Sequence, residues 1–281
     1  MAVRIAAQLQ AEIISVDSVQ VYRGMDIGTA KPNLMERGGV PHHMIDVAEP
    51  EEEFSAAAFR LMGRAVIEAS QSPALLISGG SGLHFRSLVD PMSFAPTDPT
   101  VRAELEANPP DEVTGELLGV DPEAGSHVDL ANPRRVIRAL EIFRLTGETP
   151  SRRASSAEAD DIRRFVPQIE FTAIGLDPGE LLEERVERRL AAMRSGGLVE
   201  EVQALRPRMG RVARRAVGYR EILGALGGET SIDDAFRLAA ANTRRLARKQ
   251  RTWFQRDPRI RWIPWVDDIR DRVSRALEAL G

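Results

Sequence analysis

Cysteine is absent from this 281-residue chain, and aromatic side chains supply only 5% of its residues. Without cysteine the chain has no disulfide, no thiolate metal site and no cysteine nucleophile, which fits a reducing cytoplasm. No apolar run approaches the roughly 20 residues of a membrane span, and residues 1–10 lack the apolar core and cleavage site of a signal peptide. We therefore expect a cytoplasmic protein with no membrane partner.

A large excess of positive charge is also missing. The 38 Lys and Arg residues face 42 Asp and Glu residues, which gives a formal net charge of −4. This balance argues against a protein that coats nucleic acid non-specifically, but it leaves room for a local basic groove. The length allows one or two domains with a sizeable core, and we expect a monomer.

Short apolar segments alternate with helical patterns along most of the chain. Strands are predicted at residues 13–16, 74–77, 171–176 and 260–266. Long helices are predicted at residues 55–69, 179–206 and 232–255. This alternation indicates an α/β fold with a parallel sheet. Residues 96–150 contain no strand and are rich in Glu, Pro and Arg, so we interpret them as a helical insertion.

The most informative segment follows the first predicted strand. Asp17 and Ser18 come directly after the apolar residues 13–16, and a polar loop then carries Gln20 and Tyr22. Ligands of α/β folds bind at the carboxyl ends of parallel strands, so an acid followed by many donors indicates a binding site there. Alone, Asp17 and Ser18 would more often form a turn cap, and Tyr22 can equally be a packing residue.

Residues 13–32 read IISVDSVQVYRGMDIGTAKP. This segment resembles the signature DS-x-Q-x-Y-x-G-M-D-I-G-T-A-K-P of the tRNA dimethylallyltransferases, also called tRNA isopentenyltransferases. The resemblance implies that Asp17 is the general base that takes a proton from the exocyclic amine of the target adenine. It also implies that Ser18, Val19 and Gln20 contact tRNA, with Ser18 and Gln20 holding the edge of the base.

A glycine-rich turn follows the second predicted strand. Residues 79–85 read GGSGLHF and resemble the GGTGLY turn of the same family. Glycines let a ligand approach the backbone closely, although a plain tight turn also uses them. Ser81 keeps the hydroxyl of the usual Thr and is expected to contact tRNA. His84 stands where the family usually has Tyr, and we interpret it as a tolerated variation.

Basic residues gather in the predicted insertion. Residues 132–141 read NPRRVIRALE and predict a helix, because Asn132 can cap it and Pro133 suits its first turn. A run of charge is usually only a solvated face, but this one resembles the family segment N-D-P-x-R-x-x-R-A-L-E, which contacts tRNA. The tRNA contacts implied for the insertion are Arg102, Arg134, Arg135, Val136, Ile137 and Arg138.

Two further segments near the carboxyl end resemble the family. Residues 217–221, VGYRE, resemble its GYRE element, which implies that Arg220 approaches the diphosphate of the substrate. Residues 243–254, TRRLARKQRTWF, resemble its T-R-x-x-A-K-R-Q-x-T-W-F helix, and we interpret Trp253 and Phe254 as core anchors. Basic residues interleaved with aromatic ones suit an RNA backbone. The tRNA contacts implied for this helix are Arg244, Arg245, Arg248 and Lys249.

One family feature is missing from the sequence. The family opens with a strand and a phosphate-binding loop of the form G-x-T-x-x-G-K-S/T, which holds the diphosphate and serves Mg²⁺ through a hydroxyl. No such motif occurs in the 281 residues, and residues 1–10 look like the helix that should follow it. A start codon placed too late and a truncated relative both stay open, and we favour the first because the other motifs are intact.

The resemblance implies a P-loop NTPase-like α/β fold, in which a parallel sheet carries a helical insertion and the first strand and P-loop are absent. Residues 1–95 and 151–281 are expected to form the catalytic core with the C-terminal helices, and residues 96–150 the tRNA-binding insertion. The implied reaction moves a dimethylallyl group from dimethylallyl diphosphate to N6 of the adenosine 3′ of the anticodon in tRNA. The implied cofactor is Mg²⁺, and the implied partners are tRNA and dimethylallyl diphosphate.

Three alternatives to this function remain. An adenylate isopentenyltransferase prenylates free adenine nucleotides, which require neither the basic insertion nor the basic C-terminal helix. A truncated, non-catalytic tRNA-binding relative is favoured by the missing phosphate loop, which also predicts little or no turnover by the chain as given. A nucleotide kinase fits least, because its own defining loop is missing.

Overall fold

The computed structural model describes residues 1–281 and divides them into two compact units. The first unit contains Met1–Val89 and Glu170–Gly281, and the second contains Asp90–Ile169. The expected insertion, residues 96–150, lies inside the second unit, which extends beyond it at both ends. No helix combines the length and the apolar character that crossing a membrane requires.

The first unit holds five parallel strands in two groups. They are β1 (Ala11–Val16), β2 (His42–His43), β3 (Ala74–Gly79), β4 (Ala173–Asp177) and β5 (Ile260–Pro264). One group has the order β2-β1-β3, and the other pairs β4 with β5. Val16 pairs with Gly79, so β1 and β3 end at the same level. The predicted α/β fold with parallel strands is therefore confirmed, whereas the two-residue strand β2 was not predicted.

A cavity of about 610 Å³ interrupts the sheet between β3 and β4. Residues of both strands line it, and neither strand has a pairing partner on that side. Leu75, Leu76 and Ile77 of β3 are only partly buried as a result, although Ile14 on the neighbouring β1 is fully buried. The cavity therefore separates the group β2-β1-β3 from the pair of β4 and β5.

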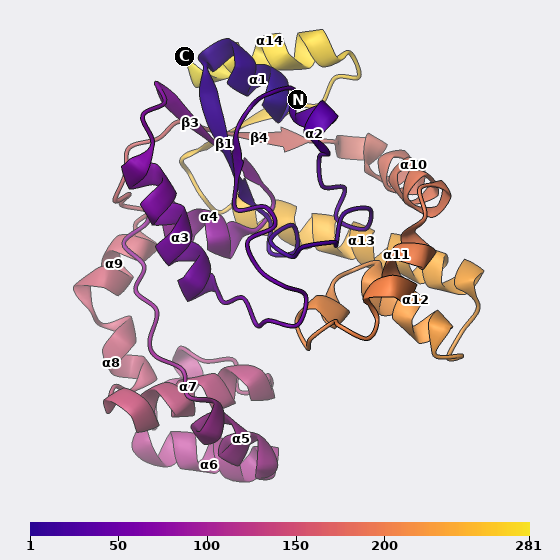
Figure 1. The fold of residues 1–281 in the computed structure, drawn as a ribbon. Coiled ribbons are helices and arrows are strands. Elements are labelled where there is room, and N and C mark those ends of the chain that lie inside the picture. Colours follow the sequence, from indigo (N-terminus) through magenta and orange to yellow (C-terminus); the bar gives the residue numbers. More distant parts are fainter. The chain divides into compact units, whose positions relative to one another are not determined.

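Nine helices surround these strands in the first unit (Figure 1). They are α1 (Ala2–Leu9), α2 (Leu34–Arg37), α3 (Ala56–Ala69), α4 (Gly82–Val89), α10 (Leu182–Ser195), α11 (Leu198–Leu205), α12 (Tyr219–Leu226), α13 (Ile232–Phe254) and α14 (Ile269–Leu280). The side chains of Ser55 and Ser231 cap α3 and α13. The predicted helix over residues 179–206 is divided, because Gly197 adopts a φ of 94°, which only glycine reaches easily.

The core of the first unit joins the end of β1 to the helices that follow it. Its fully buried side chains include Tyr22, Phe59, Leu88 and Tyr219. The 23-residue helix α13 packs on α4, α10 and α12, so it fixes the elements on which the predicted site residues lie. Tyr22 is therefore a packing residue, which was one of the two roles that the sequence left open for it, the other being a contact with a ligand.

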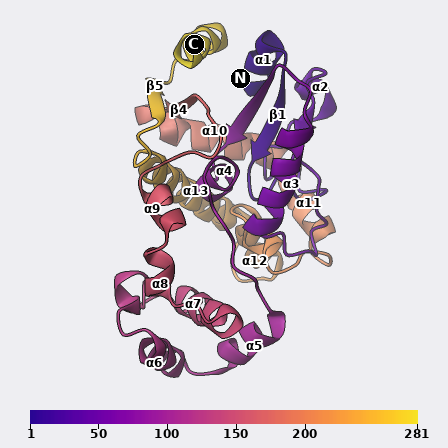
Figure 2. The same cartoon turned by 90° about the vertical axis from the view of Figure 1, so that its left-hand side faces the viewer.

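The second unit is entirely helical (Figures 1 and 2). Its helices are α5 (Pro99–Ala107), α6 (Pro110–Val120), α7 (Pro133–Thr146), α8 (Pro150–Ala154) and α9 (Ala157–Arg163). Helix α7 packs on α5 and α6 around Leu105, Leu117 and Leu140, which are fully buried. Proline opens four of these helices at a position where its missing N–H costs nothing.

Candidate active site and nucleic-acid interface

The two carboxylate oxygens of Asp17 have different surroundings. Asp17 follows the last residue of β1, and its Oδ1 accepts hydrogen bonds from the backbone N–H groups of Val19 at 2.8 Å and Gln20 at 3.2 Å. Its Oδ2 accepts no hydrogen bond from the protein, and the side chain is partly exposed. One oxygen thus caps the turn, while the other is free to accept a proton or a hydrogen bond from a ligand.

The side chains that follow Asp17 differ in how much of them is available. The Gln20 amide is used inside the protein: Oε1 accepts from the Ser15 hydroxyl at 3.0 Å, and Nε2 donates to the Thr29 carbonyl at 3.2 Å. Val19 is partly buried and packs against the main core, whereas Ser18 is exposed. Of these three predicted tRNA contacts, only Ser18 has its whole side chain open to a ligand.

The glycine-rich turn after β3 is required by the protein's own packing. A Cβ atom on Gly80 would lie 2.5 Å from Nε2 of Gln250, and one on Gly82 would lie 2.3 Å from the Trp253 ring. Both partners belong to α13, so these glycines let a helix approach the turn closely. The sequence suggested a close approach of a ligand at this turn, but the atoms that approach Gly80 and Gly82 are side chains of α13.

Ser81 and His84 form a pair at the start of α4. The Ser81 hydroxyl oxygen lies 2.6 Å from Nδ1 of His84, and the Ser81 N–H donates to the Val16 carbonyl at 3.1 Å. His84 is buried, and burial lowers the pKa of its imidazole, while the negative charge of Asp17 acts in the opposite direction. The structure therefore brings Ser81 and Asp17 to the same end of the sheet.

Sequence reasoning missed Glu201, which organises the loop after Asp17. Its carboxylate accepts from the backbone N–H groups of Asp26 at 3.0 Å, Ile27 at 2.7 Å and Gly28 at 3.2 Å. The Tyr219 hydroxyl donates to the same carboxylate at 2.5 Å, and burial raises the pKa of Tyr219 far above its ordinary value. Glu201 lies in α11, so no local sequence signal connects it with this loop.

Lys31 also holds this loop in place. Its side chain is 4% exposed, and Nζ donates to the Tyr22 carbonyl at 2.8 Å and to Asp26 and Asp46 at 2.6 Å each. A buried ammonium group with three acceptors is fully satisfied. The DIGTAK part of the signature therefore serves largely to fix the loop next to Asp17.

Arg189 of α10 is a second residue that sequence reasoning missed. Its guanidinium donates to the Thr29 carbonyl at 3.4 Å, the same carbonyl that Gln20 contacts. Desolvation lowers the pKa of Arg189, and the negative charge of Asp17 acts in the opposite direction. The positive charge of Arg189 therefore acts on Asp17, although the two residues lie far apart in the sequence.

Arg220 has a fixed but open guanidinium group. Its Nε and Nη2 donate to Oε1 of Glu221, whose carboxylate also accepts from the Gly218 N–H at 2.7 Å and from the Asn242 amide at 2.8 Å. The Glu221 side chain is 3% exposed, whereas that of Arg220 is 53% exposed. The buried carboxylate thus orients a cation that half faces solvent, as an anion-binding arginine requires.

Helix α13 presents both free and paired cations. Arg245, Arg248 and Lys249 are exposed and form no ion pair, and Arg248 lines the cavity between β3 and β4 together with Gly79 and Gly80. Arg244 instead donates to Glu187 of α10 at 2.8 Å. The first three cations are thus available to a polyanion, whereas Arg244 already has a partner.

In the second unit, a buried carboxylate engages two of the predicted tRNA contacts. Glu141 is completely buried and accepts from Arg102 at 2.6 Å and from Arg138 at 2.7 Å. Burial acts to raise the pKa of Glu141, but these hydrogen bonds and that of the Asp98 N–H outweigh it and lower the pKa. Arg102 therefore joins α5 to α7, whereas Arg138 pairs with Glu141 within α7 and also donates to the carbonyls of Ala95 and Pro96.

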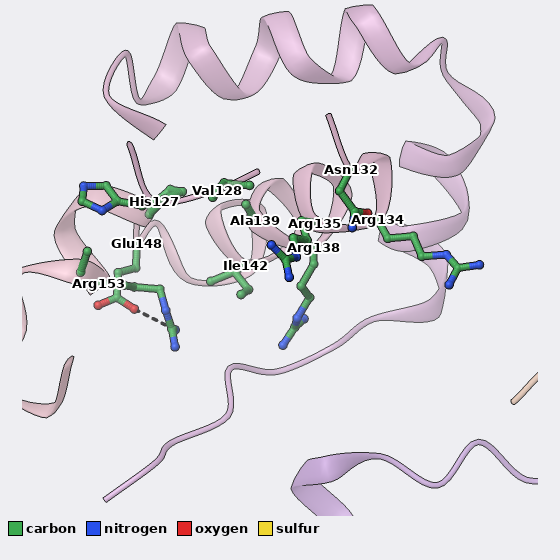
Figure 3. A pocket seen from close by; sticks show the side chains of 12 residues that line it. His127, Val128, Asn132, Arg134, Arg135, Arg138, Ala139, Ile142, Glu148 and Arg153 are labelled. Atoms are coloured by element: carbon green, nitrogen blue, oxygen red, sulfur yellow. Dashed lines mark hydrogen bonds and ion pairs between the residues drawn. The ribbon is translucent and has the colours of Figure 1, made fainter. Parts of the chain in front are cut away.

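The remaining predicted contacts on α7 divide into core and surface. Val136 is 1% exposed and belongs to the core of the unit, and Ile137 packs against that core, so their side chains are directed to the protein. Arg134 and Arg135 are exposed and lie at the rim of a cavity of about 590 Å³ (Figure 3). Arg134 forms no ion pair, and Arg135 has only Asp129 at 3.7 Å.

The candidate residues are divided between the two units, and Arg220 and the four candidates of α13 lie in the first. Asp17, Ser18, Val19, Gln20 and Ser81 lie together at the carboxyl ends of β1 and β3 in the first unit. The second unit contains Arg102 and the five candidates of α7. The structure shows no group of three or more His, Asp or Glu side chains that could hold a metal ion.

Comparisons with known proteins agree with one another. The family model of IPP transferase matches residues 20–257. A tRNA dimethylallyltransferase of Bifidobacterium longum (strain NCC 2705) is 44% identical over 261 residues, which cover 90% of this chain and 77% of that protein. A tRNA dimethylallyltransferase of Corynebacterium efficiens is 40% identical over 292 residues, which cover 100% of this chain and 94% of that protein.

Two solved structures are similar in fold. The full-length tRNA isopentenylpyrophosphate transferase from Bacillus halodurans is 33% identical, with a TM-score of 0.70 over 99% of this chain and 89% of that one. A eukaryotic dimethylallyltransferase acting on tRNA has a TM-score of 0.75 over 95% of this chain and 70% of that one. The second protein is only 22% identical, so it supports the fold alone. The predicted P-loop NTPase-like fold is confirmed by this likeness.

Proposed function

Because this chain belongs to the IPP transferase family, as its motifs predicted, we propose that it transfers a dimethylallyl group to tRNA. The proposed donor is dimethylallyl diphosphate, and the proposed acceptor is N6 of the adenosine 3′ of the anticodon. The observation that carries this proposal is the open Oδ2 of Asp17, beside an Oδ1 that two backbone N–H groups hold in place.

Asp17 is the proposed general base of this transfer. The amine nitrogen of adenine attacks the first carbon of the dimethylallyl group, a C–N bond forms, and the C–O bond to the diphosphate breaks. Asp17 Oδ2 accepts the proton that the amine loses, and the diphosphate leaves with the electron pair of the broken bond. Because Asp17 is only partly exposed at a strand end, the adenine must leave its stack to reach it.

Arg220 is the proposed cation for the departing diphosphate. Its guanidinium is oriented by buried Glu221 and is half exposed, so its remaining N–H donors are available to phosphate oxygens. Mg²⁺ supplies further neutralisation of diphosphate charge when it is bound.

Among the proposed tRNA contacts, those with the strongest structural support are exposed basic side chains that no carboxylate holds closely. Arg134 and Arg135 in the second unit, and Arg245, Arg248 and Lys249 on α13, are exposed and have at most one distant partner. Phosphate contacts of this kind supply affinity with little dependence on sequence. The contacts implied for Arg102, Arg138 and Arg244 stay predictions, because each of these guanidinium groups already binds a carboxylate.

A non-catalytic tRNA-binding protein is the second candidate function. It is favoured by one observation, the absence of a G-x-x-x-x-G-K-S/T motif from the 281 residues, from which little or no turnover was expected. We nevertheless propose transfer, because relatives named tRNA dimethylallyltransferase match 90% and 100% of this chain. The free cations of both units serve this function as well as they serve catalysis. The two candidates differ only in whether bound tRNA becomes prenylated.

A competition between acceptors tests the proposal. The protein is incubated with dimethylallyl diphosphate, Mg²⁺, unmodified tRNA and adenosine monophosphate, and both acceptors are analysed by mass spectrometry. We expect the dimethylallyl group on tRNA and none on the free nucleotide. Modified nucleotide with unmodified tRNA would identify an adenylate isopentenyltransferase, and bound but unmodified tRNA would favour the second candidate.

A further inference from the structure

We propose that His84 is a positioning residue that holds the Ser81 hydroxyl as a hydrogen-bond acceptor beside Asp17. The two acceptors, Asp17 and Ser81, then favour a ligand group that carries two N–H donors. This inference rests on the proposed function only where it identifies that group as the exocyclic amine of adenine.

The Ser81 hydroxyl does not cap the helix that begins next to it, which is the usual role of a serine in this position. The Phe85 N–H donates to the Ser81 carbonyl at 2.9 Å, so Ser81 is the residue from which α4 begins. A serine in this position normally accepts a hydrogen bond from a backbone N–H of the first turn. Here no backbone N–H donates to its hydroxyl oxygen, and Nδ1 of His84 lies 2.6 Å away.

The surroundings of His84 favour a neutral imidazole and hold the ring in one orientation. His84 is 8% exposed, and its ring meets the buried Phe59 ring edge-to-face, with the ring centroids 4.4 Å apart. Burial disfavours the charged form of an imidazole. A neutral imidazole has one nitrogen that donates and one that accepts. With Nδ1 as the acceptor, Ser81 gives its only hydrogen to His84, and both of its lone pairs stay free.

The position of Ser81 places those lone pairs at the Asp17 end of the sheet. The Ser81 N–H is anchored to the carbonyl of Val16, the residue directly before Asp17. Asp17 Oδ2 also accepts no hydrogen bond from the protein. An amine can donate one hydrogen to each of the two acceptors, whereas a carbonyl has none to donate. The pair therefore favours a 6-aminopurine over a 6-oxopurine, and Asp17 takes the hydrogen that leaves during transfer.

Nuclear magnetic resonance tests this inference without any turnover. The protein has four histidines, so a His84→Phe variant identifies the ring signals of His84 in a sample with ¹⁵N-labelled histidine. We expect an unprotonated Nδ1 at neutral pH, with a ¹⁵N shift that changes in Ser81→Ala. A protonated Nδ1 in the wild-type protein, or a shift that Ser81→Ala leaves unchanged, would overturn the inference.

A double-mutant cycle tests whether His84 acts through Ser81 during transfer. We expect His84→Phe and Ser81→Ala each to lower kcat about tenfold, the worth of one hydrogen bond in the transition state, and the double variant to be no slower than either. His84→Asn retains a polar group at the position of Nδ1 and is expected to recover most of the rate. Losses that multiply in the double variant would show that His84 acts by packing alone and would contradict the inference.

Ser72→Ala is the matched control for the loss of a serine hydroxyl. Ser72 lies before β3, whereas Ser81 lies after it. The Ser72 hydroxyl donates to the Gln10 carbonyl at 2.8 Å. We expect the rate of Ser72→Ala to match the wild-type rate per folded molecule. If wild-type protein transfers nothing to tRNA, the proposed function fails, while the resonance measurement still decides the role of His84.

Discussion

Asp17 combines a turn cap with the general-base role that we propose for it, two roles that its position in the sequence could not separate. Its Oδ1 caps the turn of Val19 and Gln20, which is the ordinary role of an Asp after a strand. Its Oδ2 is free, which is what a general base needs. A substitution that keeps the cap and removes the basicity therefore distinguishes the two roles.

Asp17→Asn is that substitution. The amide oxygen still accepts the two backbone hydrogen bonds, but the group no longer takes up a proton, so we expect single-turnover transfer to fall about a hundredfold or more. Binding of tRNA and the melting temperature should change little. Asp268→Asn is the control, because Asp268 caps α14 in the same way and is exposed. A normal transfer rate in Asp17→Asn would leave Asp17 as a turn cap only.

Glu201→Gln should loosen the loop that follows Asp17. The carboxylate accepts from three backbone N–H groups and from the Tyr219 hydroxyl, and the amide replaces one acceptor oxygen by a donor. We expect the free energy of unfolding to fall by about 1–3 kcal/mol, the cost of leaving buried polar groups unsatisfied. Hydrogen exchange should become faster at the amides of residues 26–28. Tyr219→Phe, which removes only one of the four donors, should have a smaller effect; unchanged exchange in Glu201→Gln would contradict this role.

Among individual residues, the sequence could indicate only those that lie within a recognisable local motif. Asp17 and Ser81 follow apolar strands, and their motifs resemble a known family, so the sequence alone could name both as candidates. Glu201 and Arg189 were missed because their partners Ile27 and Thr29 lie 174 and 160 residues away in the chain. Only the folded structure brings such groups together, and no periodicity or spacing reports it.

Among the elements, α7 contains a buried acid, Glu141, that makes stability depend on pH. Hydrogen bonds from Arg138 and Arg102 lower the pKa of buried Glu141 below its unfolded value. A lowered pKa contributes stability that is present above the unfolded value and is lost as the pH falls through the folded one. We therefore expect the second unit to lose stability in acid, below the ordinary pKa of a glutamic acid.

Denaturation of the protein between neutral and acidic pH measures this contribution. Glu141→Gln should be less stable by about 2–3 kcal/mol at neutral pH, because it leaves Arg102 and Arg138 without a carboxylate, and its stability should vary less with pH. Glu112→Gln on α6, whose side chain is exposed, serves as the control. If Glu141→Gln and the wild-type protein lost the same free energy of unfolding in acid, Glu141 would not be the source of the pH dependence.

The exposed arginines of α7 are the ones expected to bind tRNA phosphates. Arg134→Ala with Arg135→Ala should weaken tRNA binding and reduce the slope of log K against log salt by about 1 for each phosphate contact that is lost. Folding should be unaffected, because both side chains are exposed. Arg163→Ala on α9, which removes an arginine paired with Asp160, is the control. If the double substitution left the slope of log K against log salt unchanged, this face of α7 would be only a solvent-exposed surface that does not bind tRNA.

Elements with strong patterns were predictable, and short or interrupted ones were not. The helix predicted at residues 232–255 and the strand at residues 74–77 correspond to α13 and β3 within a few residues. The two residues of β2 are too few to show any alternation of side chains. The division between α10 and α11 depends on the backbone conformation at Gly197, which charge and hydropathy patterns do not report.

At the scale of the whole molecule, an acidic chain carries two local sets of cations. The net charge of −4 reflects many surface carboxylates, and the free arginines and lysine lie on α7 and α13. The order of strands, with a cavity between β3 and β4, could not be derived from composition, because pairing partners are set by tertiary contacts. The family could be recognised because its motifs occur in both units.

The location of the transferred group tests the central claim most directly. Unmodified tRNA is incubated with the protein, dimethylallyl diphosphate and Mg²⁺, and then digested and sequenced by mass spectrometry. The account predicts a dimethylallyl group on N6 of the adenosine 3′ of the anticodon and on no other nucleotide. Transfer to a different position, or tRNA that binds tightly and stays unmodified, would contradict it.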